Sequence, residues 1–167
     1  MHSMDGWPPD FRGWIPGFPG FGVVLARCPD AVLTLTCPAA YPDALRLDLT
    51  LLLVPQPSGE TFDARFEPGA PDWLTVSMEW PDRSVTSWGT SSWHRRDSAA
   101  TGGCTLEAMS SDGGPDGIQW NLVLHPLPPS GTAVVTVTGD DFDRSHSSTL
   151  DLSDAITSAA RAERWAR

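Results

Sequence analysis

The chain is punctuated by a proline directly followed by an aspartate, a pair that occurs six times in 167 residues. Proline fixes φ near the value needed at the second position of a type I turn, and an aspartate side chain accepts hydrogen bonds from the turn backbone. Random order would give roughly one or two such pairs. Five of the six stand just before an apolar run, which predicts many short strands separated by tight reversals. The pairs are Pro9-Asp10, Pro29-Asp30, Pro42-Asp43, Pro71-Asp72, Pro81-Asp82 and Pro115-Asp116.

The strand prediction is clearest between residues 45 and 53. Leucine occupies every odd position there, while Arg46, Asp48 and Thr50 fall between the leucines. Side chains alternate between the two faces of a strand, so this pattern is typical of a half-buried strand with a leucine face. Residues 110–117 are predicted to form a loop. Other apolar runs between turn signals predict further strands at residues 21–27, 31–37, 74–80, 84–88, 105–110, 118–125 and 132–138.

The pattern of elements indicates the fold class. The strand at 132–138 has valine on both faces, which predicts a central position in its sheet. One helix is expected over residues 153–164, where alanines and Ile156 form a narrow apolar stripe. Runs of strands followed by one helix favour packed antiparallel sheets over alternating βα units. We therefore predict a mainly β protein, an antiparallel two-sheet β-sandwich of about eight strands with one C-terminal α-helix, as a single domain over residues 23–167.

Residues 1–22 are expected to form an extended N-terminal arm ahead of this domain. Prolines and glycines interrupt the segment so often that neither helical nor strand periodicity develops. Its aromatic side chains could lie over the domain's own sheet and close an edge of the core. Alternatively, they could dock onto another subunit or protein, since so many aromatics left in water form an adhesive patch. The candidate interface residues are Trp7, Phe11, Trp14 and Phe18.

Charge narrows the range of partners. The formal net charge is −10 at pH 7, and the cationic side chains are 11 arginines with no lysine. Affinity for nucleic acid without sequence preference depends on clustered cations that displace counterions from phosphates. We therefore expect no binding to nucleic acid and none to anionic membranes. The expected partner is another protein or a second copy of the chain.

The lack of a recognisable targeting signal and the pattern of cysteines predict the cellular compartment. The N-terminus has no basic segment followed by an apolar run, and no apolar stretch is long enough to span a membrane. We therefore expect a cytoplasmic protein. Cys28, Cys37 and Cys104 are an odd number without CxxC spacing, which favours reduced thiols over a disulfide framework. Cys37 continues the buried face of the strand at 31–37, which predicts a core thiol.

One cationic and aromatic cluster stands out in this acidic chain. Its members could stack a sugar or a base, or bind a carboxylate through the arginine guanidinium groups. Alternatively, the tryptophans could fill the end of the core while the arginines pair with nearby aspartates. The candidate ligand-binding residues are Trp88, Trp93, His94, Arg95 and Arg96.

The sequence gives little indication of metal binding or catalysis. Asp140, Asp141 and Asp143 form the densest acidic cluster, but they lack the glycine and glutamate positions of an EF-hand loop. A solvated loop, partly neutralised by Arg144, is the preferred interpretation. No zinc-binding spacing and no nucleophile elbow is present in the sequence. We expect no metal, no cofactor and no enzymatic activity.

Three segments together resemble a known group of proteins. They are the Pro-Leu-Pro-Pro segment after His125 with the strand and alanine-rich helix that follow it, the opening strand with Val23 and Val24, and the leucine strand after Tyr41. This order is similar to that of a family of uncharacterised actinobacterial proteins, in which a Trp-Pro-Leu-Pro-Pro-Pro-like segment precedes the last strand. His125 stands where that family has tryptophan. The resemblance covers roughly half of the chain, implies a β-rich fold and carries no assigned activity.

Three hypotheses about function remain open at this point. The first is a non-enzymatic β-sandwich that acts by binding another protein or as a structural subunit, through the N-terminal arm, the loop at 89–103 or an exposed strand edge. The second is a small-ligand or carbohydrate-binding module that uses Trp88 and Trp93 as stacking platforms. The third is an acidic immunity-type inhibitor of a basic toxin, suggested by size and charge.

Overall fold

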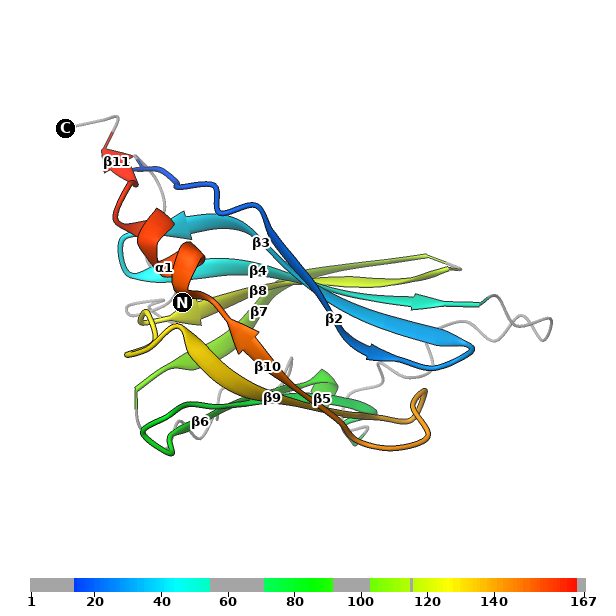
Figure 1. Ribbon diagram of the computed structural model, residues 1–167. Coiled ribbons are helices and arrows are strands. Elements are labelled where there is room, and N and C mark those ends of the chain that lie inside the picture. The colour runs from blue at the N-terminus through cyan, green and yellow to red at the C-terminus, as the bar shows by residue number, and fades with distance from the viewer. Residues whose placement is uncertain (1–13, 55–70, 92–102, 115, 165–167) are drawn as a thin grey trace, which may run out of the picture.

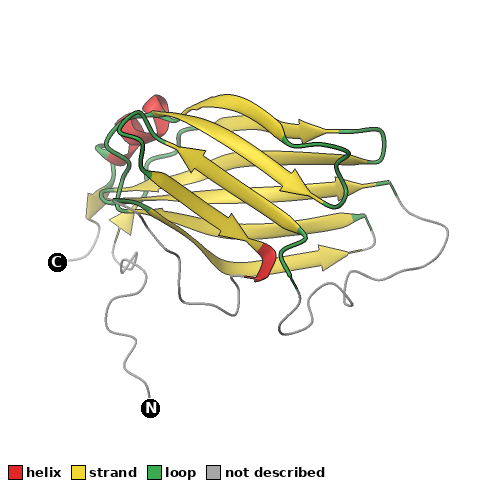
Figure 2. Ribbon diagram, turned by 90° about the horizontal axis from the view of Figure 1, so that it is seen from below, coloured by secondary structure: helices red, strands yellow, loops and turns green. Residues whose placement is uncertain are grey.

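Two main antiparallel sheets, a two-stranded ribbon and one short helix are the regular elements of the described part of the chain (Figures 1 and 2). The computed structural model describes residues 14–54, 71–91, 103–114 and 116–164. The elements are β1 (Trp14–Ile15), β2 (Phe21–Arg27), β3 (Ala31–Tyr41), β4 (Ala44–Leu53), β5 (Leu74–Glu79), β6 (Val85–Gly89), β7 (Thr105–Gly114), β8 (Gly117–His125), β9 (Thr132–Gly139), β10 (His146–Asp151), α1 (Ser153–Ala159) and β11 (Glu163–Arg164).

The sheets pack face to face as the sequence predicts. The five-stranded sheet has the order β2-β3-β4-β8-β7, and the four-stranded sheet has the order β10-β9-β5-β6. A separate two-stranded ribbon joins β1 to β11. Figure 1 shows the five-stranded sheet above the four-stranded one, with α1 at one end. The predicted fold class is confirmed: the protein is mainly β, with two antiparallel sheets and one short C-terminal helix.

All eight predicted strands are present, but one predicted loop is wrong. β7 does not stop at Ser110; it continues to Gly114 in register with β8, and the last pair is Gly114 opposite Gly117. The Ser-Gly-rich composition of residues 110–117 indicated a loop, because glycine and serine have low strand propensity. Cross-strand pairing with β8 outweighs that propensity here.

The sequence analysis does not predict β10. Leu150 is the only residue of this strand that is fully buried, while Ser147 and Thr149 face outward. β10 forms because it pairs with β9 along its whole length. β9 therefore lies between β10 and β5, and its predicted central position is confirmed. Val134 is nevertheless 48% exposed. β9 is therefore central because it pairs with a strand on each side, and not because both of its faces are buried.

The C-terminal helix is shorter than predicted. α1 ends at Ala159, and the chain then turns so that Glu163 and Arg164 pair with β1 as the strand β11. Ala155 and Ala159 are buried in α1, which packs on β3 and β4. The prediction of a helix to residue 164 was wrong because pairing with the N-terminal segment replaces the last helical turn. No helix in the described ranges is long and apolar enough to cross a membrane.

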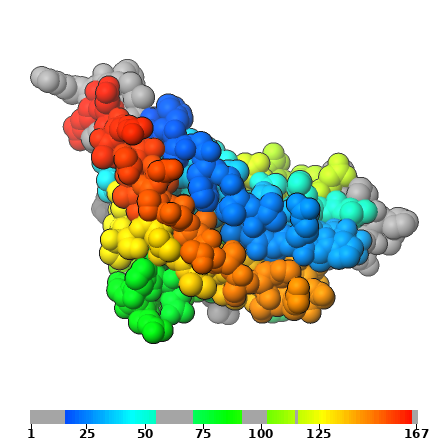
Figure 3. All heavy atoms as spheres, in the orientation of Figure 1, coloured from blue at the N-terminus to red at the C-terminus, as the bar shows by residue number. Residues whose placement is uncertain are grey.

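The described part of the predicted arm is held against the domain. Gly17 and Ala40 of β3 exchange two backbone hydrogen bonds, each 2.8 Å long. A Cβ atom at residue 17 would collide with the backbone carbonyl of Ser158 in α1. The segment thus passes between a strand and a helix where only glycine fits. In Figures 1 and 3 this segment, drawn in blue, runs beside β3 toward the red C-terminal elements.

The core lies between the two sheets. Leu45, Leu47, Leu49 and Leu51 are fully buried, which confirms the predicted leucine face of β4. In the same core, Trp120 contacts two other tryptophans, Trp73 and Trp88. The ring of Trp120 is 5.8 Å from that of Trp73 and 5.3 Å from that of Trp88, measured between ring centroids. These spacings are typical of tilted and edge-to-face aromatic pairs.

Candidate functional site

Trp88 is the one residue of the predicted ligand-binding cluster that the structure describes, and its side chain is buried. This side chain is only 2% exposed and meets the ring of Trp120 edge-on in the core. Trp88 therefore presents no exposed face to a ligand, which corrects the expectation of a stacking platform at this position. Trp93, His94, Arg95 and Arg96 lie outside the described residues.

Of the four predicted interface residues, the structure describes two, Trp14 and Phe18. Phe18 is 75% exposed, more than any other large apolar side chain among the described residues. Trp14 belongs to β1, and its backbone pairs with Arg164 of β11. Trp7 and Phe11 lie outside the described residues. The one aromatic of the predicted interface whose side chain is described thus projects into solvent just before the edge strand β2.

Backbone groups of the acidic cluster and two of the cysteines take part in hydrogen bonds or packing within the described region. Asp140 donates its backbone N–H to the carbonyl of Trp73, and the thiol of Cys28 donates to the carbonyl of Asp141 at 3.1 Å. Burial raises the pKa of the Cys37 thiol to about 12, so this thiol stays protonated. Across the residues that the structure describes, no three His, Cys, Asp or Glu side chains gather closely enough to hold a metal.

Exposed apolar side chains concentrate on the five-stranded sheet. Six large apolar residues are well exposed in the described region, and five of them lie on this sheet or on the segment that leads into it. Val134 on β9 is the exception. Scattered single apolar residues are normal on a protein surface, whereas a concentration on one face marks an interaction site. The five residues are Phe18, Val24, Leu52, Val54 and Met109.

Strand register brings several of these side chains together. Leu52 of β4 lies opposite Val32 of β3, and Val24 of β2 lies opposite Thr34, two positions further along β3. Val54 lies two residues after Leu52 and so is on the same face of the strand direction, and its backbone N–H donates to the carbonyl of Asp30. We call Val24, Val32, Leu52 and Val54 the aliphatic patch. Leu52 is 50% and Val54 is 52% exposed.

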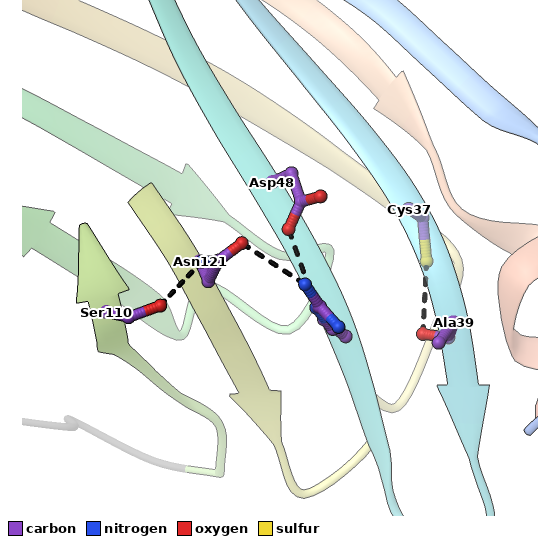
Figure 4. Close-up of polar contacts among 6 residues, drawn as sticks. Cys37, Ala39, Asp48, Ser110 and Asn121 are labelled. Atoms are coloured by element: carbon purple, nitrogen blue, oxygen red, sulfur yellow. Dashed lines mark hydrogen bonds and ion pairs between the residues drawn. The ribbon is translucent and has the colours of Figure 1, made fainter. Parts of the chain in front are cut away.

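A polar network crosses the same outer face further along the strands (Figure 4). Arg46 of β4 donates from Nη2 to Oδ1 of Asn121 on β8 at 3.3 Å, and Asn121 donates from Nδ2 to the hydroxyl of Ser110 on β7 at 2.5 Å. Arg46 Nε also lies 3.6 Å from Oδ1 of Asp48. The network links three neighbouring strands and fixes the guanidinium group of Arg46, whose side chain remains 45% exposed.

A third group of side chains lies beside this network. Glu107 of β7 and Arg46 of β4 stand opposite Val123, which is buried between them on β8. Partial burial raises the pKa of Glu107, and the charge on His125 works in the opposite direction. His125 Nε2 lies 3.6 Å from Oδ2 of Asp43. The outer face therefore has an aliphatic patch at one end and charged groups of both signs at the other.

Replacement of Glu107 by Gln should raise the free energy of unfolding at neutral pH. Because its folded pKa is raised, the folded protein holds this proton more tightly than the unfolded chain does. Stability therefore falls as pH rises from the ordinary value of 4.5 through the folded pKa. The variant lacks this loss, so its advantage should be absent at low pH and grow as pH rises. Urea unfolding across this pH window measures it, and an advantage independent of pH would contradict the assignment.

The outer face of the four-stranded sheet has a different character. Hydroxyl side chains of neighbouring strands bond to one another there, at 2.9–3.0 Å. These hydroxyls are therefore hydrogen-bonded to one another on the solvent-facing side of the sheet. The hydrogen-bonded pairs are Ser77 with Ser87, Thr136 with Ser147 and Thr138 with Ser145.

Comparison with protein-family models, with curated proteins and with solved structures finds no significant match to this chain. Fold and surface therefore define the class of protein: a two-sheet antiparallel β protein with one outer face lined by hydroxyls and the other by aliphatic and charged side chains. Sequence analysis missed the aliphatic patch. A signal for it was available, because Leu52 and Val54 break the alternation of the leucine strand at positions where its other outward residues are polar.

Proposed function

We propose that this protein is a non-enzymatic β-sandwich that acts by binding another protein through the outer face of its five-stranded sheet. The observation that carries the proposal is the unequal distribution of exposed apolar side chains between the two outer faces. Contact with a partner would remove the aliphatic patch from water. Burial of apolar surface is the main favourable term in protein association.

The polar network supports the same proposal. Interfaces typically combine a desolvated apolar centre with a polar rim, and arginine is enriched in them. Arg46 is held by Asn121 and Asp48, so little side-chain entropy would be lost when its exposed donors bind a partner. A largely pre-formed surface of this kind suits rigid docking.

Replacement of Leu52 by Asp should abolish capture of the partner. An aspartate at the centre of an apolar contact must be desolvated without a counter-charge, which is expected to weaken binding by roughly 30-fold or more. The matched control is Val134→Asp on the other outer face, where the native side chain is 48% exposed against 50% for Leu52. Both variants should keep the native circular dichroism spectrum.

The measurement is quantitative affinity capture with the full chain as bait, with wild type and the two variants compared side by side. Proteins retained by wild type and by the Val134 variant but lost from the Leu52 variant are the expected result. Equal loss in both variants, or equal retention, would show that this face is not the binding surface.

A further inference from the structure

Among the described residues, no strand pairs with the outer edge of the five-stranded sheet along half of that edge. β7 is the last strand of this sheet, and within the described ranges its only paired neighbour is β8. At its start β7 lies close to β6, where the Thr86 hydroxyl donates to the carbonyl of Cys104 at 3.2 Å. Figure 1 shows β7 diverging from β6 toward the far end of the hairpin. We call residues 109–114 the distal edge; all six are exposed.

The distal edge belongs to a broad sheet and is not an isolated hairpin. Gly114 pairs with Gly117 of β8, which in turn pairs with Leu52 of β4. β4 continues the ladder to β3, where Leu53 lies opposite Ala31. A two-stranded hairpin is marginally stable, whereas an edge backed by three further strands is a fixed template for an added strand.

The side chains of β7 do little to block pairing at this edge. Natural edge strands are commonly protected by lysine, proline or a bulge. β7 contains neither lysine nor proline, and its bulge lies between Ala108 and Ser110, ahead of five successive pairs with β8. Ser111 and Gly113, which face the same side as Trp120 and Ile118, are small and exposed. Apart from Met109 at the bulge, the distal edge therefore carries no bulky side chain that would shield its backbone.

Charge indicates what kind of strand would bind. The ionisable side chains of β7 are Glu107 and Asp112, both acidic. Opposite charges on neighbouring strands stabilise a sheet, and like charges directly opposite each other destabilise it. A second copy of the chain would bring the same acidic edge and a net charge of −10. A basic segment from another protein meets the charge requirement and a second copy does not.

We propose that the distal edge accepts an extended basic segment of another protein as a sixth strand of the five-stranded sheet. Backbone hydrogen bonds to the distal edge supply the affinity, and an arginine or lysine on the outer face of the added strand lies opposite Asp112. This inference rests on the proposed function and specifies the chemistry of the partner. The added strand would lie beside Ser110, at the end of the polar network that begins at Arg46.

A peptide of alternating Val and Arg tests the inference on the full chain, with an alternating Val and Glu peptide as control. We expect the basic peptide to slow hydrogen exchange of alternate amides within the distal edge and the acidic peptide to leave them unchanged. Asp112→Arg should weaken binding of the basic peptide by about fivefold or more. Asp143→Arg, at an exposed aspartate in the turn after β9, makes the same charge change elsewhere and should leave binding within about twofold.

Protection at another site, or equal binding of both peptides, would overturn this inference. A concentration-dependent dimer that protects the same amides without peptide would also overturn it and assign the edge to a second copy. These outcomes are separable from the proposed function, because the Leu52→Asp comparison probes the sheet face and not its edge. If that comparison succeeds while the peptide fails, only the edge assignment is lost.

Discussion

Trp120→Ala should lower the free energy of unfolding by about 3–5 kcal/mol, the largest loss expected from any single replacement considered. Trp120 is 2% exposed and touches both Trp73 and Trp88. Its removal deletes two aromatic contacts and leaves a cavity between the sheets, which the strands on either side cannot close without breaking their ladders.

Chemical denaturation of the full chain measures this loss. Trp120→Phe is the control, because it keeps an aromatic ring and removes less side-chain volume than alanine does. It should therefore lower the free energy of unfolding clearly less than the alanine variant. In a chain of 167 residues, each kcal/mol lost corresponds to about 2–4 °C in the unfolding midpoint. A loss below about 1 kcal/mol for the alanine variant would mean that the three indoles do not form a packed core.

Gly17→Ala should destabilise the domain by about 2–3 kcal/mol. The new methyl group would meet the backbone carbonyl of Ser158, and a backbone atom cannot move aside as a flexible side chain does. Either α1 or the N-terminal segment must shift, and the hydrogen bonds between Gly17 and Ala40 are lost in the second case. The β1–β11 ribbon would then separate from the end of the sandwich.

Gly22→Ala provides the matched control. A Cβ atom there would lie 3.5 Å from the Thr36 methyl group, an ordinary contact, so the variant should keep wild-type stability. Thermal unfolding and limited proteolysis of both variants distinguish the two sites. Equal behaviour of the two glycine variants would show that the N-terminal segment does not pack between β3 and α1.

The inner face of the sandwich is more predictable than the outer one. Leucine at every odd position of β4 is sufficient to place that strand, because burial on one face imposes a period of two. β10 escapes prediction because its outward residues are polar and its inward face has a single leucine. The end of α1 could not be predicted, because pairing with a strand more than a hundred residues away in sequence competes with helix propensity.

The candidate site depends on information that one strand does not contain. Arg46, Asn121 and Ser110 come together because β4 pairs with β8 and β8 with β7, and no local pattern specifies those partners. The two alternatives for Trp88 could not be separated from the sequence for a related reason: an indole that ends a strand near a polar loop can point inward or outward, and cross-strand neighbours decide which. The outward position of Leu52, in contrast, follows from the alternation of side chains along β4 alone, because Leu52 lies between the buried residues at odd positions.

The strand order has a consequence for how the chain acquires its structure. Each main sheet draws on strands from both halves of the sequence, since β4 pairs with β8 and β5 pairs with β9. Neither half can complete a sheet while the other is still being synthesised. Folding should therefore be slow and cooperative, on the order of milliseconds to seconds as in other domains dominated by non-local pairing. A nascent chain that has emerged only as far as β6 would expose its leucine face to chaperones.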